Sequence, residues 1–278
     1  MTTQQGRRML VHIGVQKTGT TSLQRFLEQS SDALADCLVI RTPREGTPMR
    51  PLGRAAIACS LSDDKDLRTG LRLAFEDVLE TVPEGHHPLL LSHENLAGAM
   101  PGNGGETGLY PALPRMLKIL DKTAQACGFF PHYVLYTRQM RTWLPSVWAQ
   151  AVRTDGYDQT LPQFEAETSG LPGWGDLTRR LADALGPGRV TRLRLEDEPD
   201  PERPGRQLLL LAGVEASRID ALPPLGRRAM ERLNGGSTEF LRRLNGLALN
   251  PHARDRVADL VARSQHLFTA DAPSEGTL

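Results

Sequence analysis

The sequence has few cysteines, no long apolar segment and no excess of charge of either sign. The three cysteines, Cys37, Cys59 and Cys127, form neither a CxxC nor a Cys/His metal motif, so we expect free thiols in a reducing compartment and assign no metal. No apolar run reaches the roughly 18–20 residues that a membrane-spanning helix needs, and none near the start is long enough for a signal peptide. These absences predict a cytoplasmic protein with no membrane span.

The charge balance excludes one further class of protein. Lysine plus arginine and aspartate plus glutamate both number 33, so the formal net charge is zero. A dedicated nucleic-acid binder would present a net basic surface, so we expect no nucleic-acid partner, while a small basic pocket is compatible with this balance. The length of 278 residues fits one large domain, and we predict a single domain over residues 1–278.

Short apolar segments alternate with longer amphipathic segments along the chain. Apolar and β-branched composition predicts strands at residues 9–13, 38–40, 88–92, 130–136 and 189–195. Apolar positions at helical spacing predict helices at 22–28, 66–80, 112–126 and 139–152, and a mainly helical part over about 204–270. Segments 42–53 and 100–108 are rich in turn-forming residues and are predicted to be loops. This alternation predicts an α/β fold with a mostly parallel central sheet flanked by helices on both faces.

A turn rich in glycine and threonine runs from Gly14 to Ser22, between the first predicted strand and the first predicted helix. A helix N-terminus after such a turn presents backbone N–H groups and partial positive charge to an anion. Gly14 and Gly19 allow the backbone to approach a phosphate closely, and Lys17 adds a mobile cation. Hydroxyl donors come from Thr18, Thr20, Thr21 and Ser22. The turn therefore predicts a phosphate site, but it is not a Walker A motif, because the lysine precedes the second glycine.

A second candidate anion site follows the predicted strand 130–136. The strand is followed by Arg138, and Ser146 comes eight residues later in the predicted helix 139–152. An arginine fork can bind a phosphate bidentately. Eight helical residues span about 12 Å, so Ser146 could reach the same anion only if Arg138 lies in a bend before the helix.

The order of residues 12–24, His-Ile-Gly-Val-Gln-Lys-Thr-Gly-Thr-Thr-Ser-Leu-Gln, resembles the 5′-phosphosulfate loop of bacterial sulfotransferases that use 3′-phosphoadenosine 5′-phosphosulfate (PAPS). The resemblance implies a three-layer, P-loop-like fold and PAPS as the donor substrate, with no metal. It also implies that the loop binds the 5′-phosphosulfate and that Arg138 and Ser146 bind the 3′-phosphate. The reaction would be sulfuryl transfer to a hydroxyl or amine of a small-molecule or glycan acceptor. The resemblance alone suggests that this acceptor is a carbohydrate or a lipid-linked alcohol.

The candidate catalytic residues are Lys17, Glu94 and His93. Lys17 would stabilise the charge that builds on the leaving phosphate oxygen. The predicted strand 88–92 is followed by His93 and Glu94, and ligands of parallel sheets bind beyond the carboxyl ends of strands. The Ser-x-Glu pattern of the bacterial relatives favours Glu94 as the general base, whereas the intrinsic pKa of histidine favours His93. Neighbouring residues of an extended segment point to opposite sides, so we expect only one of the two in the pocket.

The resemblance to these sulfotransferases stops at two places in the sequence. Ser22 stands where many cytosolic sulfotransferases have a tryptophan that stacks on adenine, so adenine recognition stays unassigned. The nearest candidates for the C-terminal basic, glycine-rich loop of those enzymes are Arg227-Arg228 and the segment 234–237.

Two other functions stay open. A P-loop kinase-like enzyme would need the residue order of the Walker A motif, and a non-catalytic nucleotide- or phosphate-binding relative would need no general base. We expect the acceptor pocket to be formed by loops at roughly 42–66, 98–112 and 153–175.

Overall fold

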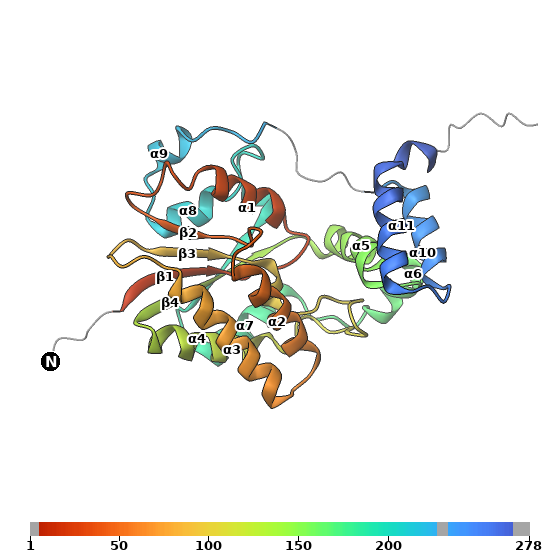
Figure 1. Ribbon diagram of the computed structural model, residues 1–278, viewed down its shortest axis with the longest axis horizontal. Helices are drawn as coiled ribbons and strands as arrows, with labels where there is room; N and C mark the ends of the chain where they lie inside the picture. The colour runs from red at the N-terminus through yellow and green to blue at the C-terminus, as the bar shows by residue number, and fades with distance from the viewer. Residues whose placement is uncertain (1–5, 227–232, 269–278) are drawn as a thin grey trace, which may run out of the picture.

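The computed structural model describes residues 6–226 and 233–268 and contains a five-stranded, all-parallel sheet (Figure 1). The strands lie in the order β2-β3-β1-β4-β5. Their bounds are β1 Arg7–His12, β2 Val39–Arg41, β3 Leu89–Ser92, β4 Phe129–Thr137 and β5 Val190–Arg194. Every predicted strand is present, and the predicted α/β fold is confirmed.

Helices cover both faces of the sheet, because successive apolar residues of each strand point to opposite sides. In β1, Met9 and Val11 belong to one buried cluster and Leu10 to the other. The first face is covered by α2 Met49–Leu61, α3 Lys65–Glu80, α4 Leu113–Ala126 and α7 Trp174–Leu185. The second face is covered by α1 Thr20–Gln29, α8 Arg206–Ala212 and α9 Ala216–Asp220. The result is a three-layer arrangement.

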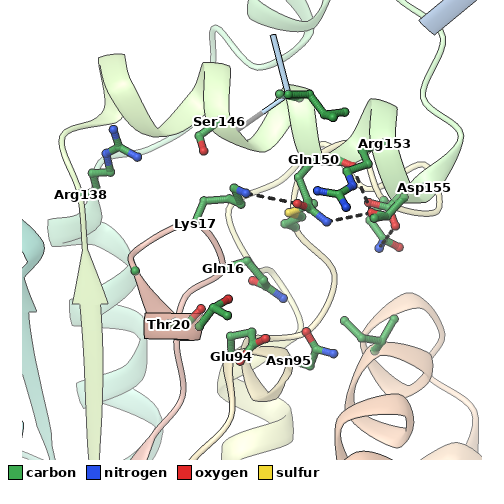
Figure 2. Close-up of a pocket in the computed structure, with 18 of the residues that line it drawn as sticks. Gln16, Lys17, Thr20, Glu94, Asn95, Arg138, Ser146, Gln150, Arg153 and Asp155 are labelled. Atoms are coloured by element: carbon green, nitrogen blue, oxygen red, sulfur yellow. Dashed lines mark hydrogen bonds between the residues drawn. The ribbon is translucent and has the colours of Figure 1, made fainter. Parts of the chain in front are cut away.

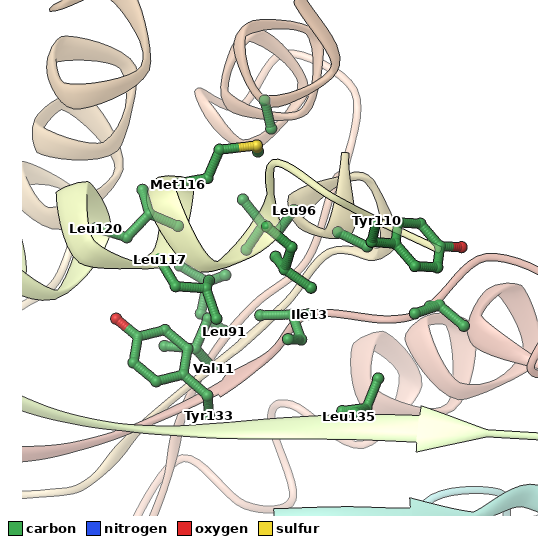
Figure 3. Packing of buried hydrophobic residues seen from close by; sticks show 14 of the residues in the cluster. Val11, Ile13, Leu91, Leu96, Tyr110, Met116, Leu117, Leu120, Tyr133 and Leu135 are labelled. Atoms are coloured by element: carbon green, nitrogen blue, oxygen red, sulfur yellow. The ribbon is translucent and has the colours of Figure 1, made fainter. Parts of the chain in front are cut away.

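Figure 3 shows the core on the first face, where β-strand side chains meet the helix α4. Val11, Leu91 and Tyr133 come from three adjacent strands and are fully buried. They pack with Leu117 and Leu120 of α4. Burying each such side chain contributes about 1.5–3 kcal/mol relative to exposure, so this layer fixes the positions of the strand ends that carry the candidate site.

A third cluster lies to the side of the sheet, where the last helices pack on the end of α5 Met140–Gln150 (Figure 1). The helix continues as the π-helix η2 Ala151–Asp155. Its buried Val152 packs with Leu241 and Val261. The other helices in this region are α6 Leu161–Glu167, α10 Gly235–Asn245, α11 Pro251–Arg263 and the 3-10 helix η4 Gln265–Phe268. Elsewhere, two short 3-10 helices follow strands: η1 Glu94–Ala97 comes after β3, and η3 Leu195–Asp197 comes after β5. The predicted helical C-terminal part is confirmed within the described residues.

The loop predicted at 42–53 is wrong in its second half, because α2 begins at Met49. Pro51 favoured a loop in the sequence analysis. It lies in the first turn of α2, where a helix needs no backbone N–H donor. Gly53 is required inside the helix by a close contact, since a Cβ there would lie 2.1 Å from Nε2 of His93. Helix α6 also occupies part of the segment 153–175 that was predicted to form a loop.

Within residues 6–226 and 233–268, no helix combines the length and the apolar character needed to cross a bilayer.

Candidate active site

A cavity of about 600 Å³ lies beyond the carboxyl ends of β1, β3 and β4 (Figure 2). Three segments that are far apart in the sequence contribute predicted residues to its wall. These residues are Lys17, Gly19, Thr20, Thr21, Ser22, Glu94, Arg138 and Ser146. The remaining predicted residues, Gly14, Thr18 and His93, do not line it. The parallel sheet thus brings most of the predicted site to one place, as expected for strands that end at the same edge.

The turn between β1 and α1 has backbone geometry that favours glycine at two positions. Gly14 has a φ of 96° and Gly19 a φ of 79°, both in the left-handed region. A Cβ on Gly14 would lie 2.9 Å from Cα of Glu94, so glycine lets the turn cross that residue. Thr18 closes the turn, because its buried Oγ1 donates to the carbonyl oxygen of Val15 at 2.6 Å. Gly14 and Thr18 therefore shape the loop rather than line the cavity.

Side chains outside the motif brace the loop at Gln16. The indole Nε1 of Trp143 donates to the carbonyl oxygen of Gln16 at 2.9 Å. The hydroxyl of Tyr110 donates to Oε1 of Gln16 at 2.8 Å, and Gln16 Nε2 donates to the carbonyl oxygen of Gly98 at 2.9 Å. Both aromatic side chains are buried. These contacts hold the loop in one conformation before any ligand binds.

Lys17 and the first turn of α1 present the positive end of the site. The Nζ atom of Lys17 donates to Oε1 of Gln150 at 3.2 Å (Figure 2). Thr20, Thr21 and Ser22 form the first turn of α1, and Gly19 is its N-cap. Free N–H groups of a first helical turn and a lysine ammonium favour an anion at this position.

Arg138 lies in the bend between β4 and α5, which is the position that allows it to share a ligand with Ser146. Its Nε donates to Oγ1 of Thr142 at 3.1 Å, and its carbonyl oxygen accepts a hydrogen bond from Nε1 of Trp174 at 2.7 Å. Ser146 lies in the second turn of α5 and is buried. Both side chains line the same cavity as Lys17. The bend before the helix, which Arg138 and Ser146 need if they are to reach one anion, is therefore present.

The structure separates the two candidates for the general base. Glu94 begins η1 and lines the cavity, and its Oε2 accepts a short hydrogen bond from Nε2 of Gln24. His93 is buried beside Gly53, and its Nδ1 accepts a hydrogen bond from the backbone N–H of Asn95 at 3.3 Å. Burial lowers the pKa of His93 and keeps the ring neutral. Glu94 is the one that faces the cavity.

The far end of the cavity contains residues that no sequence motif singled out, although most of them fall within the segments 98–112 and 153–175 that were expected to form the acceptor pocket. Asn103, Gln150, Arg153, Thr154 and Asp155 line it, and four of these belong to the end of α5 or to η2. Burial raises the pKa of Asp155 to about 6, and its Oδ1 accepts a hydrogen bond from Nδ2 of Asn103 at 3.0 Å. No motif marked these residues, because they converge only through the packing of η2.

Of the two segments proposed as a C-terminal phosphate loop, the structure describes only one. Arg227-Arg228 lie outside the described residues. The segment 234–237 is the start of α10, where Oδ1 of Asn234 caps the helix by accepting from the backbone N–H of Ser237 at 2.8 Å. It is therefore a helix cap, although the preceding Leu233 does line the cavity.

Comparison of the chain with protein-family models and with curated proteins found no match. The assignment of a function consequently rests on the residues of the cavity, their geometry and the resemblance of residues 12–24.

Proposed function

We propose that this protein is a sulfotransferase that transfers a sulfuryl group from PAPS to a hydroxyl or amine of an acceptor. The observation that carries the proposal is the convergence of the 14–22 loop, Glu94 and the Arg138/Ser146 pair on one cavity. The loop and the pair provide two separate anion sites, and PAPS carries a phosphosulfate and a 3′-phosphate. ATP has no 3′-phosphate for the second site to bind.

The cavity contains side chains for each step of an in-line displacement. The acceptor oxygen or nitrogen attacks the sulfur, and the bond between sulfur and the bridging phosphate oxygen breaks. Negative charge then builds on that oxygen, where Lys17 and the N–H groups of the first turn of α1 stabilise it. Glu94 accepts the proton that the acceptor loses. The products are the sulfated acceptor and adenosine 3′,5′-bisphosphate.

One observation favours an enzyme over a non-catalytic relative. A binding protein needs Lys17 and Arg138 but no base, whereas the Glu94 carboxylate lines this cavity beside the loop. The order Lys17-Thr18-Gly19 likewise disfavours a kinase-like enzyme, whose Walker A motif would place the lysine directly after the second glycine and not before it. A cytoplasmic location belongs to the same proposal, and it is supported by the three cysteines, all of which are free thiols.

Product binding tests the proposal directly. Adenosine 3′,5′-bisphosphate at 100 times its dissociation constant adds about 2.7 kcal/mol to the free energy of unfolding, which raises the melting temperature by roughly 5–10 °C. ATP with Mg²⁺ should stabilise the protein far less. Stabilisation by ATP with Mg²⁺ but not by the bisphosphate would contradict the proposal. In the same series, Lys17→Ala should reduce sulfuryl transfer by about 10²–10³-fold, which radiolabelled PAPS measures.

A further inference from the structure

We infer that the far end of the cavity, formed by Asn103, Gln150, Thr154 and Asp155 and called here the acceptor end, binds a polyhydroxylated acceptor through the Asp155 carboxylate. This inference rests on the proposed function and identifies the class of substrate that the same cavity accepts. It is carried by an unsatisfied carboxylate oxygen, by the contacts that hold η2 in place, and by the chemical character of the wall.

The carboxylate of Asp155 has one oxygen that is hydrogen-bonded and one that is buried without a partner. Oδ1 accepts a hydrogen bond from Asn103, while Oδ2 is buried and has no hydrogen-bond partner among residues 6–226 and 233–268. A buried acceptor without a partner costs about 1–3 kcal/mol, and more when it is charged. Oδ2 lies beneath the surface of the cavity wall, so a rotation of the carboxylate is needed to turn it toward the cavity, where a hydroxyl group of a bound acceptor donates to it and removes this cost.

The C-terminal helices hold the backbone of η2 in place. The Arg254 guanidinium of α11 donates to the carbonyl oxygens of Val152 at 3.2 Å and of Arg153 and Thr154 at 3.3 Å. Asn245, at the end of α10, donates from Nδ2 to the carbonyl oxygen of Val152 at 2.7 Å. These are the carbonyl groups that a helix end leaves without an internal partner. With its backbone satisfied in this way, η2 keeps Asp155 fixed in the wall, as a preorganised binding group should be.

Hydrogen bonds connect the acceptor end with the lysine of the phosphate loop (Figure 2). Gln150 accepts from Nζ of Lys17 at 3.2 Å and donates from Nε2 to Oγ1 of Thr154 at 3.2 Å. An acceptor bound beside Asp155 therefore lies along the same wall as the group that would stabilise the leaving phosphate. Glu94 belongs to the same cavity and can take the proton of the attacking hydroxyl.

The composition of the wall indicates the class of acceptor. Its carboxylate, amide, threonine hydroxyl and Arg153 guanidinium groups include both acceptors and donors, which matches hydroxyl groups that do both. No aromatic residue lines the cavity among the described residues, and its apolar wall is small, with Ile57 and Met100 as examples. Such a wall suits the hydroxyls of a sugar better than a lipid chain. An acceptor carboxylate placed against Asp155 would be repelled, whereas one placed against Arg153, which lines the same end, would be attracted, so the charge of the preferred acceptor reports which of the two side chains it contacts.

The test uses the full chain, radiolabelled PAPS and two probes that differ in one group: methyl β-D-glucopyranoside and methyl β-D-glucuronide at millimolar concentration. The wild type should label the neutral glycoside and not the uronide. Asp155→Asn keeps the shape of the side chain and removes its charge, and it should raise the KM for the glycoside at least tenfold while the KM for PAPS is unchanged. The matched control is Asp158→Asn, which removes a carboxylate from the same segment outside the cavity wall; it should leave both KM values as in the wild type.

Three results would overturn the inference. The first is labelling of the uronide in preference to the glycoside, and the second is an unchanged KM for the glycoside in Asp155→Asn. The third is a wild type that labels neither probe and gives no saturation-transfer NMR signal from the glycoside when loaded with adenosine 3′,5′-bisphosphate. Failure of the proposed function looks different, because the bisphosphate would then not stabilise the wild type at all.

Discussion

At one end of the cavity the wall is a turn and two strand ends that the sheet fixes in place, whereas at the other it is a π-helix held by two C-terminal helices. The 14–22 loop follows β1 directly, and Arg138 follows β4. The acceptor end depends on η2, whose carbonyl groups are bound by Arg254 of α11 and Asn245 of α10. The first end is supported by strands that are buried on both faces. The second is supported by a smaller cluster around Val152.

This difference in support has a functional consequence. The two ends share Gln150 as a link but have separate scaffolds, so substitutions at one end should change the binding of one substrate and spare the other. Glu94 alone should matter to the chemistry that joins the two substrates. The following experiments test this division, beginning with the largest expected effect.

Glu94→Gln should lower the turnover of sulfuryl transfer by about 10²–10⁴-fold, because the amide cannot accept the acceptor proton. The isosteric amide keeps a side chain that can still contact Gln24. Steady-state kinetics with radiolabelled PAPS measure the loss. An unchanged melting shift with adenosine 3′,5′-bisphosphate shows that the nucleotide still binds at the 14–22 loop and Arg138. Full turnover in this variant, or loss of turnover only in His93→Asn, would assign the base elsewhere.

Arg138→Ala should weaken the binding of adenosine 3′,5′-bisphosphate by about 10–100-fold, since a charged hydrogen bond to phosphate contributes about 1.5–3 kcal/mol. Arg141→Ala is the matched control: Arg141 lies three residues further along, is exposed and does not line the cavity. Titration calorimetry compares the two variants. Equal losses of affinity would mean that general charge, and not the fork of Arg138, binds the product.

The sheet and the end of the cavity formed by the 14–22 loop and Arg138 could be predicted from the sequence because their signals are local. A buried strand, two glycines and a lysine stand next to one another, and Arg138 directly follows its strand. For the acceptor end the sequence indicated only the segments 98–112 and 153–175, and no motif pointed to a particular residue. Asp155 enters the cavity because α5 continues as a π-helix, and a helical periodicity of 3.6 residues does not reveal where that change occurs. Helix α2 was missed for a different reason: Pro51 and Gly53 resemble a loop, and only the contact with His93 explains the glycine.

The smallest expected effect concerns the stability of the acceptor end. Burial raises the pKa of Asp155 to about 6 against the opposing influences of the Thr154 hydroxyl and the Arg254 charge, so the folded state holds this proton more tightly than the unfolded state does. Between pH 3.8 and about 6 the folded wild type therefore binds more protons than the unfolded chain, and this residue costs stability as the pH rises through that window. Asp155→Asn lacks this cost. At pH 7 the variant should be more stable than the wild type by about 1–2 kcal/mol, a value discounted for partial exposure.

Denaturant unfolding at pH 4 and pH 7 measures this difference between variant and wild type. Other titrating groups act equally in both proteins, among them His12, whose pKa burial lowers to about 3, so their contributions cancel in the comparison. The gain in the Asp155→Asn variant should be present at pH 7 and shrink toward pH 4, and Asp158→Asn should show no such pH-dependent gain. A loss of stability at pH 7 in Asp155→Asn would mean that the carboxylate supports the fold. A gain, together with weaker binding of the glycoside, would mean that the acceptor end retains an unfavourable charge because the acceptor requires it.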